Sequence, residues 1–420
     1  MPNEGVTHMK NRRYGAAAAL ASSLVLLTAA CSSSGSSASS GSTSGSSGSS
    51  KAPYNIGLAA GITGPAAAIV TGEIEGIKAA FSQVNASGGI DGRKLNLITS
   101  DTQNEATTAV AALTKLATEN NVIASFGDVL ANNCQAQVPV AKAHQIPLIC
   151  GTVDPEQLQP AEPYVYTEYG AEITETNGMT DIIENAPLNI AHPKVAIVYL
   201  QSSSNEPLFN AVAAKIKADG GQVVLTDPIQ AELNLSVDAS KVISSGANVV
   251  VEQIIPQQLQ SLAQSLANSG SKVPIVAEAT TSSYQQMVLL KNPNIYEMSL
   301  DPFVDPTSTD PAVTDYVNAL KLQGISGVSA INGQSIAITY ASAEALIAAL
   351  KMCGASCTNT EVDTDLQKVS LNLPGIDTDY SYTSTQHYPQ TTFDLYQWSS
   401  SKNDVVQLRD DVPSNPIPNS

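Results

Sequence analysis

The sequence predicts an α/β protein built from two doubly wound lobes. An apolar run at 56–60, a helical pattern at 66–85 and a second apolar run at 94–99 form one strand–helix–strand unit. Short apolar runs without strict alternation are typical of parallel strands that are covered on both faces. The same alternation continues to Asn185 and begins again at Lys194, which indicates a second lobe of the same design.

The remaining elements follow the same reasoning. Pro256 opens a helical pattern, a position that proline favours, and Gly220 and Gly221 end the pattern before them. We expect helices at 105–119, 132–144, 174–185, 206–218, 237–245, 256–268, 282–290, 311–322, 333–352 and 361–371. We expect strands at 122–126, 146–150, 164–167, 195–200, 223–226, 248–252, 273–277, 391–398 and 404–408, with a frayed end after Asp411.

Charge and missing motifs exclude several functions. The 420 residues carry 20 Lys and Arg against 38 Asp and Glu, a net charge of −18. Such a surface repels phosphate backbones, so we expect no nucleic-acid partner. The sequence has no nucleophile elbow, phosphate loop or dinucleotide fingerprint, and His144, His192 and His387 lie far apart. We therefore expect neither an enzyme nor a bound cofactor or metal.

The first 51 residues predict export and tethering. Three basic residues between positions 10 and 13 precede an apolar segment at 16–30, as in a signal peptide. The segment ends in Leu-Thr-Ala-Ala-Cys, which resembles a bacterial lipoprotein signal with Cys31 as the lipidated residue. A secretory signal cut after Ala30 is the alternative. Residues 32–50 contain only Ser, Gly, one Ala and one Thr, which is typical of a flexible tether spanning about 25 Å.

The cysteine count agrees with lipidation. An exported chain with five cysteines has one left over if the others pair. Lipidation of Cys31 leaves four, for which we expect the disulfides Cys134–Cys150 and Cys353–Cys357. Free buried thiols are the alternative for each pair.

Several short motifs near the N-terminus occur in a specific order. They are the strand Ile56-Gly57-Leu58, the turn Thr63-Gly64-Pro65, the helix end Val84-Asn85, the turn at 88–92 and Leu95. Together they resemble the type I periplasmic binding proteins, the Leu/Ile/Val receptor family of ABC importers. The resemblance extends from about residue 54 to about residue 408. It implies two discontinuous lobes joined by a three-strand hinge, with crossovers near 167–174, 296–304 and 387–392, that close around a ligand.

The resulting domain organisation has five parts. We expect a signal peptide at 1–30, a tether at 31–51, a first lobe at 52–168 with 303–388, a second lobe at 169–302 with 389–412, and a frayed tail at 413–420.

Ligand-binding residues are expected in the loops that follow strands, since the carboxyl ends of parallel strands meet at one edge. The helix that begins near Asn132 and Asn133 suits a carboxylate. The resemblance implies that a glutamate after a second-lobe strand holds an ammonium, and Glu278 matches its position. Where the family has a serine-rich turn, this chain has Leu-Ala-Asn-Asn at 130–133. The candidate residues are Thr63, Asn132, Asn133, Thr152, Asp154, Asn205, Ile254 and Glu278.

Each candidate has a structural alternative. Glu278 is otherwise a solvated loop carboxylate, Thr152 and Asn133 are local capping residues, and Asp154 before Pro155 is a turn former. The two aromatic positions of the family fall at Ser204 or Asn205, and at Ile254 or Ile255.

These expectations describe a solute-binding lipoprotein on the outer face of the cell membrane. It would be a monomer that captures a branched-chain or aliphatic amino acid, or a related compound, and presents its closed form to an ABC permease. The alternatives are a ligand sensor on the same fold that feeds a signalling partner, a secreted enzyme, and a surface scaffold without a ligand.

Overall fold

The two predicted lobes are present in the computed structural model of the protein. The structure describes residues 51–417 except 171, 203, 204, 231, 334, 390, 391 and 416. The predicted signal peptide, Cys31 and the tether up to residue 50 lie outside the described residues. Residues 50–420 form one compact unit that contains two main sheets and a short hairpin.

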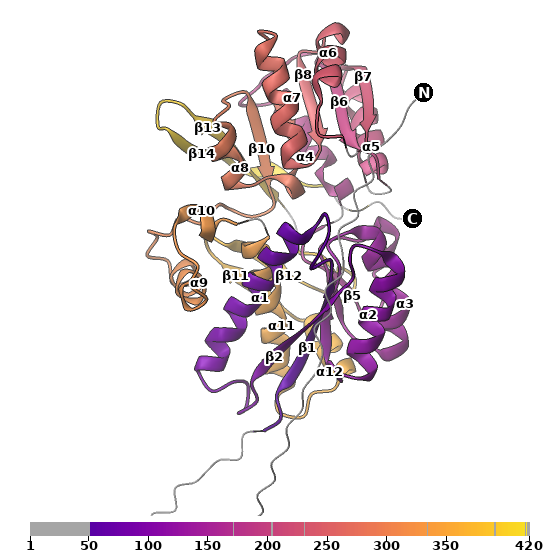
Figure 1. Ribbon diagram of the computed structural model, residues 1–420, viewed down its shortest axis with the longest axis vertical. Helices are drawn as coiled ribbons and strands as arrows, with labels where there is room; N and C mark the ends of the chain where they lie inside the picture. Colours follow the sequence, from indigo (N-terminus) through magenta and orange to yellow (C-terminus); the bar gives the residue numbers. More distant parts are fainter. Residues whose placement is uncertain are drawn as a thin grey trace, which may run out of the picture. The chain divides into compact units, whose positions relative to one another are not determined.

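The first lobe is built on a five-stranded parallel sheet with the order β2-β1-β3-β4-β5 (Figure 1). Side chains of β1 alternate between two apolar clusters, with Ile56 and Leu58 on one face and Ala59 on the other, which explains why this strand has no polar alternation. The strands are β1 (Tyr54–Ala60), β2 (Leu95–Asp101), β3 (Ala124–Phe126), β4 (Leu148–Cys150) and β5 (Val165–Thr167).

Helices cover both faces of this sheet. The helices α1 (Ala67–Ala86) and α11 (Ile336–Cys353) pack on one face, and α2 (Ala106–Thr118) and α3 (Ala131–His144) on the other (Figure 1). Gly76 lets α1 and α11 approach closely, because a Cβ there would lie 2.3 Å from Thr339 Oγ1. Among the described helices, α11 alone is long and apolar enough to cross a membrane, but 61% of it is buried, so it is a core helix of this lobe.

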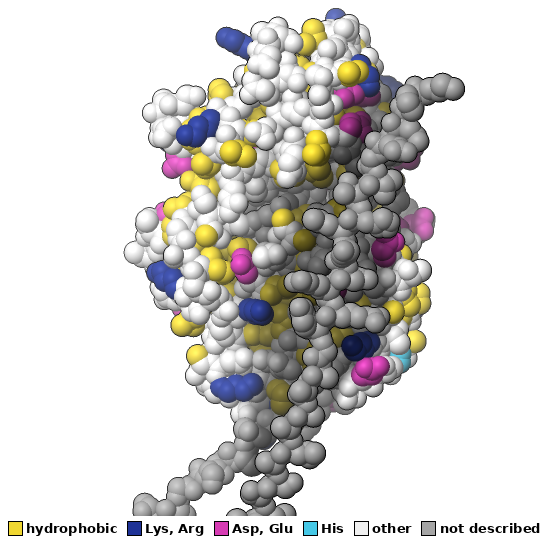
Figure 2. All heavy atoms as spheres, viewed as in Figure 1, with side chains coloured by type: hydrophobic (Ala, Val, Ile, Leu, Met, Phe, Trp, Pro, Cys, Tyr) yellow, Lys and Arg dark blue, Asp and Glu magenta, His cyan; other side chains and the backbone are white. Residues whose placement is uncertain are grey.

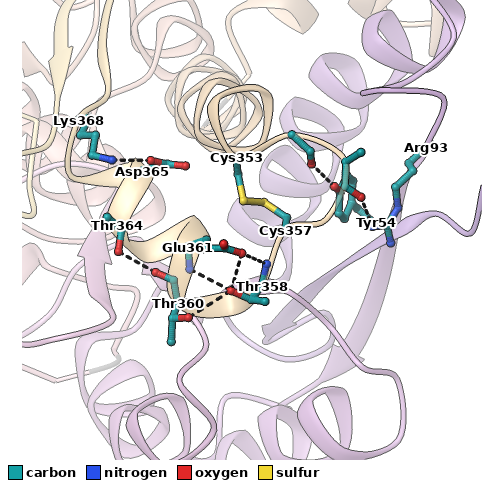
Figure 3. The surroundings of a disulfide bond; sticks show 12 residues. Tyr54, Arg93, Cys353, Cys357, Thr358, Thr360, Glu361, Thr364, Asp365 and Lys368 are labelled. Carbon is teal, nitrogen blue, oxygen red and sulfur yellow. Dashed lines mark hydrogen bonds and ion pairs between the residues drawn. A yellow bond between two sulfur atoms is a disulfide. The ribbon is translucent and has the colours of Figure 1, made fainter.

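The first lobe is completed by segments far along the chain. Tyr54 Oη donates a hydrogen bond to the carbonyl of Gly354, and the Arg93 guanidinium lies 3.7 Å from the centre of the Tyr54 ring. A disulfide joins Cys353 and Cys357 beside this contact (Figure 3). The further elements are α9 (Pro311–Leu322), α10 (Val328–Ile331), α12 (Asn359–Leu366), and the hairpin of β11 (Ser370–Leu373) and β12 (Asp377–Ser381).

The second lobe is built on a seven-stranded sheet with the order β14-β13-β10-β9-β8-β6-β7, in which β13 runs antiparallel to both neighbours. Its strands are β6 (Lys194–Leu200), β7 (Gln222–Ile229), β8 (Val249–Gln253), β9 (Ile275–Ala277), β10 (Ile295–Ser299), β13 (Thr392–Ser399) and β14 (Asp404–Pro413). Its helices are α4 (Thr176–Glu184), α5 (Asn205–Ala218), α6 (Ser236–Ser245), α7 (Pro256–Asn268) and α8 (Tyr284–Leu290).

The chain passes between the two sheets three times. The crossings follow β5, β10 and β12, and single turns of 3₁₀ helix lie near several strand ends. These turns are η1 (Pro155–Gln157), η2 (Glu172–Glu175) and η3 (Ala279–Thr281).

Three expectations about local structure are wrong. The helix expected at 361–371 ends at Leu366, and Leu371 pairs with Tyr380 in the β11–β12 hairpin. The crossover expected from residue 296 starts only after β10, whose Tyr296 pairs with Val276. The tail is not frayed as far as Ile417, which is 4% exposed, because β14 pairs with β13 and the residues beyond it pack back onto the protein.

Candidate functional site

A cavity of about 440 Å³ lies between the two lobes. Loops at the carboxyl ends of strands from both sheets line it, which is where ligands bind in such sheets. We call its two sides the first wall and the second wall. The first wall comprises Ile69, Val129, Leu130, Ala131, Asn132, Gly151, Thr152, Glu168, Tyr169, Ser335 and Ile338. The second wall comprises Leu200, Gln201, Ser202, Asn205, Gln253, Ile255, Thr280, Thr281 and Leu300.

The N-terminus of α3 belongs to the first wall. Ala131 and Asn132 in its first turn line the cavity, and no side chain caps this helix end. The N–H groups of a helix N-terminus and its partial positive charge favour an anion. The first wall therefore offers a place for a ligand carboxylate.

A buried carboxyl group holds the loop before α3. Asp128 accepts hydrogen bonds from Thr102 Oγ1 at 2.5 Å, from the Leu130 amide at 3.1 Å and from Asn133 Nδ2 at 3.3 Å. Burial raises the pKa of the Asp128 carboxyl, and these hydrogen bonds oppose that rise. Asn133 thus supports the loop from behind and does not line the cavity.

A disulfide lies directly behind the same wall. It joins Cys134, in the first turn of α3, to Cys150, the last residue of β4, with 6.2 Å between the Cα atoms. Both cysteines are fully buried. Asn132, two residues before Cys134, and Gly151, directly after Cys150, line the cavity, so this bond couples two loops of the first wall.

The polar groups of the second wall are neutral. Its side chains are amides, hydroxyls and aliphatic groups. Asn205 Nδ2 donates to the Leu200 carbonyl at 2.7 Å and to Gln253 Oε1, and it thereby connects the ends of β6 and β8. Asn205 is 2% exposed, so its amide is fixed by these partners.

Glu278 lies behind the second wall and does not line the cavity. It is fully buried, and its carboxyl accepts a hydrogen bond from Thr280 Oγ1 at 2.7 Å. Burial raises its pKa. Glu252 and Glu297 lie on the neighbouring strands at the level of Ala277, with which both pair, so three glutamates stand in one buried row.

The carboxyl group that lines the cavity is that of Glu168, directly after β5. It is 5% exposed, and burial raises its pKa to about 8. The buried carboxyls of Glu73 and Asp128 lie in the same region. Among the described residues, no lysine, arginine or histidine lines the cavity. The sequence signal for Glu168 was a charged residue at the carboxyl end of a buried strand, which we had assigned to a crossover.

Three of the eight predicted site residues meet at the cavity, namely Asn132, Thr152 and Asn205. Thr152 is 3% exposed, and Asn132 is exposed.

The other five predicted residues lie elsewhere. Thr63 donates a hydrogen bond to Asp101 at 2.6 Å and is exposed. Asp154 precedes η1, whose Gln157 amide donates to its carbonyl. Ile254 is fully buried in the core of the second lobe, and its neighbour Ile255 lines the cavity instead. Asn133 and Glu278 lie behind the two walls.

Surface charge and metal chemistry add little to this site. On the face drawn in Figure 2, Lys and Arg side chains stand apart from one another and form no basic patch. Within the described part of the chain, no group of three or more His, Cys, Asp or Glu side chains could hold a metal ion.

Two α/β lobes with a cavity at their facing strand ends form the architecture expected of a solute-binding protein. A family model described as periplasmic binding protein matches residues 53–403. The chain belongs to that family and has the type I fold, as the N-terminal motifs predicted.

Two curated relatives are similar in sequence. Leu/Ile/Val-binding protein homolog 3 of Brucella melitensis is 23% identical over 362 residues, which cover 84% of this chain and 93% of that protein. An amino acid binding protein of Pseudomonas aeruginosa is 24% identical over 200 residues, or 46% of this chain. In that second alignment the chain spans about half of the relative, 52% of its length.

Solved structures share the fold at low identity. A branched chain amino acid ABC transporter protein from Thermus thermophilus with bound valine has a TM-score of 0.74 and 13% identity, over 87% of this chain and 97% of that chain. A solute binding protein of an ABC transporter from R. palustris, in complex with 4-hydroxybenzoate, has a TM-score of 0.73 and 13% identity. The match covers 88% of this chain and 98% of that chain. Proteins of this fold therefore hold ligands of more than one chemical class.

Proposed function

We propose that this chain is the extracytoplasmic solute-binding lipoprotein of an ABC importer and that it captures a small solute between its two lobes. The observation that carries the proposal is the cavity of about 440 Å³, which is lined by strand ends of both lobes and is of the size of small-molecule sites. A ligand that touches both walls binds the closed form better than the open form, and this difference in affinity drives closure.

The first wall supports a solute with a carboxylate. No side chain caps the N-terminus of α3, whose Ala131 and Asn132 line the cavity, and Thr152 lies in the same wall. Aliphatic side chains on both walls, such as Val129 and Ile255, suit an apolar body. An aliphatic amino acid or a related compound fits this combination.

Export and anchoring are part of the proposal. The N-terminal segment and Cys31 support a lipid anchor, and the tether that follows would hold the lobes close to the membrane. In this position the closed form can meet a permease. The substitution Cys31→Ser is expected to move the protein from the membrane fraction to the soluble fraction of fractionated cells, whereas the signal peptide remains able to direct export.

A thermal-shift screen of the purified full chain tests ligand capture. The panel contains aliphatic amino acids, small amides, sugars and aromatic acids. A ligand at 100 times its Kd adds about 2.7 kcal/mol to the folded state. We expect one class to raise the melting temperature.

A matched pair of variants tests whether the ligand binds in this cavity. Ile338→Trp fills the cavity with an indole ring and should abolish the shift, whereas Leu322→Trp, on the exposed face of α9, should retain it. Equal ligand shifts in both variants would place the binding site elsewhere. A panel that stabilises neither the wild type nor the variants would contradict solute capture of these classes.

A further inference from the structure

The charges at the cavity are distributed unequally between its walls. Glu168 and the partial positive charge of the α3 N-terminus both belong to the first wall, and the second wall is neutral. Among the described residues, the lining contains no cationic side chain that would pair with Glu168. A buried carboxylate is unfavourable unless a positive charge or hydrogen bonds compensate it. Among the described residues that line this cavity, none supplies that positive charge, so a cationic ligand is the group that would stabilise the ionised form of Glu168.

A second buried carboxyl group lies next to the cavity. A smaller cavity of about 50 Å³ shares Thr280, Leu300, Ser335 and Ile338 with the main one, and Asp301 lines it. Asp301 is 8% exposed, and its Oδ2 atom has no hydrogen-bond partner. Burial raises the pKa of both carboxyls, so a cation in these adjoining cavities would favour their ionised forms.

The family resemblance implied that Glu278 holds the ligand ammonium, but Glu278 does not line the cavity. Glu278 lies behind the second wall, where Thr280 covers one of its oxygens. Glu168, by contrast, lines the cavity itself and follows β5 at the carboxyl edge of the first sheet.

We propose that Glu168 binds the protonated amine of the ligand, so that the cleft selects small solutes with a cationic nitrogen and discriminates against solutes whose only charge is a carboxylate. The inference rests on the proposed function, because it concerns the same cavity. It further implies that the first lobe recognises both charged ends of a zwitterion, whereas the second lobe closes over it with neutral groups.

Three matched probes separate the two charges. Leucine carries both groups, 3-methylbutylamine lacks the carboxylate, and 4-methylpentanoate lacks the amine. With the full chain in a calorimeter, we expect leucine and 3-methylbutylamine to bind and 4-methylpentanoate and benzoate to bind at least tenfold more weakly. Preferential binding of 4-methylpentanoate or benzoate within the cavity would overturn the inference and leave solute capture intact. Absence of binding by every solute would instead contradict the proposed function.

Three variants locate the counter-charge. Glu168→Gln should weaken the binding of 3-methylbutylamine at least tenfold, because loss of a charge-assisted hydrogen bond has an effect of about this size. Glu278→Gln should change its Kd by less than about threefold, and Glu119→Gln, on the exposed end of α2, controls for net charge. A large loss in Glu278→Gln together with none in Glu168→Gln would assign the ammonium to Glu278 instead. Circular dichroism melting checks that each variant is folded.

The pH profile distinguishes binding from a structural role. An amine needs the ionised form of Glu168, so its affinity should increase from pH 6 to pH 8.5 in the wild type, by up to about tenfold per pH unit. The increase should be flattened in Glu168→Gln. The titratable groups that face Glu168 are Glu73 on α1, Asp301 after β10, Tyr380 on β12 and Tyr382 directly after β12, and Asp128 lies beyond Glu73. A profile that is the same in both proteins would show that one of these groups causes it and would overturn the assignment.

Discussion

The two walls of the cavity place their carboxyl groups differently. The first wall presents Glu168 to the cavity and holds Asp128 behind it with three hydrogen-bond donors. The second wall presents neutral groups and hides the row of Glu252, Glu278 and Glu297, in which each carboxyl has one oxygen without a partner. This difference in position gives a buried carboxyl one of two effects. A carboxyl on the wall can select a ligand, whereas a carboxyl behind the wall changes the pH dependence of folding.

The largest expected effect concerns the hidden row. Burial raises the pKa of Glu297 to about 8, and it also raises those of Glu252 and Glu278. The unfolded chain releases the Glu297 proton near pH 4.3, so between about pH 5 and pH 8 the folded state holds this proton and the unfolded state does not. The free energy of unfolding should therefore fall as pH rises, by about 1.4 kcal/mol per pH unit from Glu297, and Glu252 and Glu278 act in the same direction. Urea denaturation at pH 5, 6, 7 and 8 measures this pH dependence of the free energy of unfolding.

A single substitution sharpens this prediction. Glu297→Gln keeps an acceptor for Ser282 and Ser283 but cannot ionise. The free energy of unfolding of this variant should fall less steeply across the same window. We expect its slope to be about 1.4 kcal/mol per pH unit smaller than that of the wild type. An unchanged slope, or stability that rises with pH in the wild type, would show that the row does not behave as buried acids.

The next largest effect concerns the disulfide behind the first wall. Replacing Cys134 and Cys150 by serine opens a loop of 16 residues and should lower the free energy of unfolding by about 3 kcal/mol. Ligand affinity should fall as well, because the two loops of the first wall lose their covalent link. The matched control replaces Cys353 and Cys357, which close a loop of only 4 residues far from the cavity lining. Equal losses of affinity in both double variants, measured by calorimetry, would contradict a specific role of the first pair.

A smaller effect is expected on the neutral wall. Asn205→Ala removes the hydrogen bonds to Leu200 and Gln253 that connect β6 and β8. We expect the Kd of the bound solute to rise about fivefold, equivalent to about 1 kcal/mol. Asn318→Ala, on the exposed side of α9, is the control. A loss that exceeds that of Glu168→Gln would show that the second wall dominates recognition.

The smallest effect is expected at Thr63. Its hydroxyl bonds to Asp101 outside the cavity lining, so Thr63→Ala should leave ligand affinity within about twofold. Calorimetry with the solute found in the screen measures it. A tenfold loss of ligand affinity would show that the loop after β1 contributes to the binding site.

Much of the fold could be predicted because its signals are local. The helix α9 has the predicted bounds, and α7 begins at the predicted Pro256, since a proline in the first turn marks a helix start. The strand β10 was missed because Ile295–Ser299 contains Glu297, whose charge is unusual in a buried strand. The hairpin of β11 and β12 was missed because its pairing, not its residue pattern, defines it.

The site was harder to predict than the fold. Asn132, Thr152 and Asn205 lie at the ends of recognisable strands, and the general rule for parallel sheets placed them at the cavity. Glu278 satisfied the same rule but lies behind the wall, and Thr280 and Thr281 of the same loop line the cavity instead. Ser335 and Ile338 carry no signal of their own and reach the cavity only through the packing of α11 on α1.

The sequence by itself determined the alternation of strands and helices, the family and the predicted tether, because periodicity, turn residues and composition are properties of short segments. The tertiary structure alone decided which carboxyl group lines the cavity. Glu168 and Glu278 both follow buried strands in the sequence, and both are almost completely removed from water. Only the packing of distant segments left open space beside Glu168 and covered Glu278, and the free energy of each charge depends on that space.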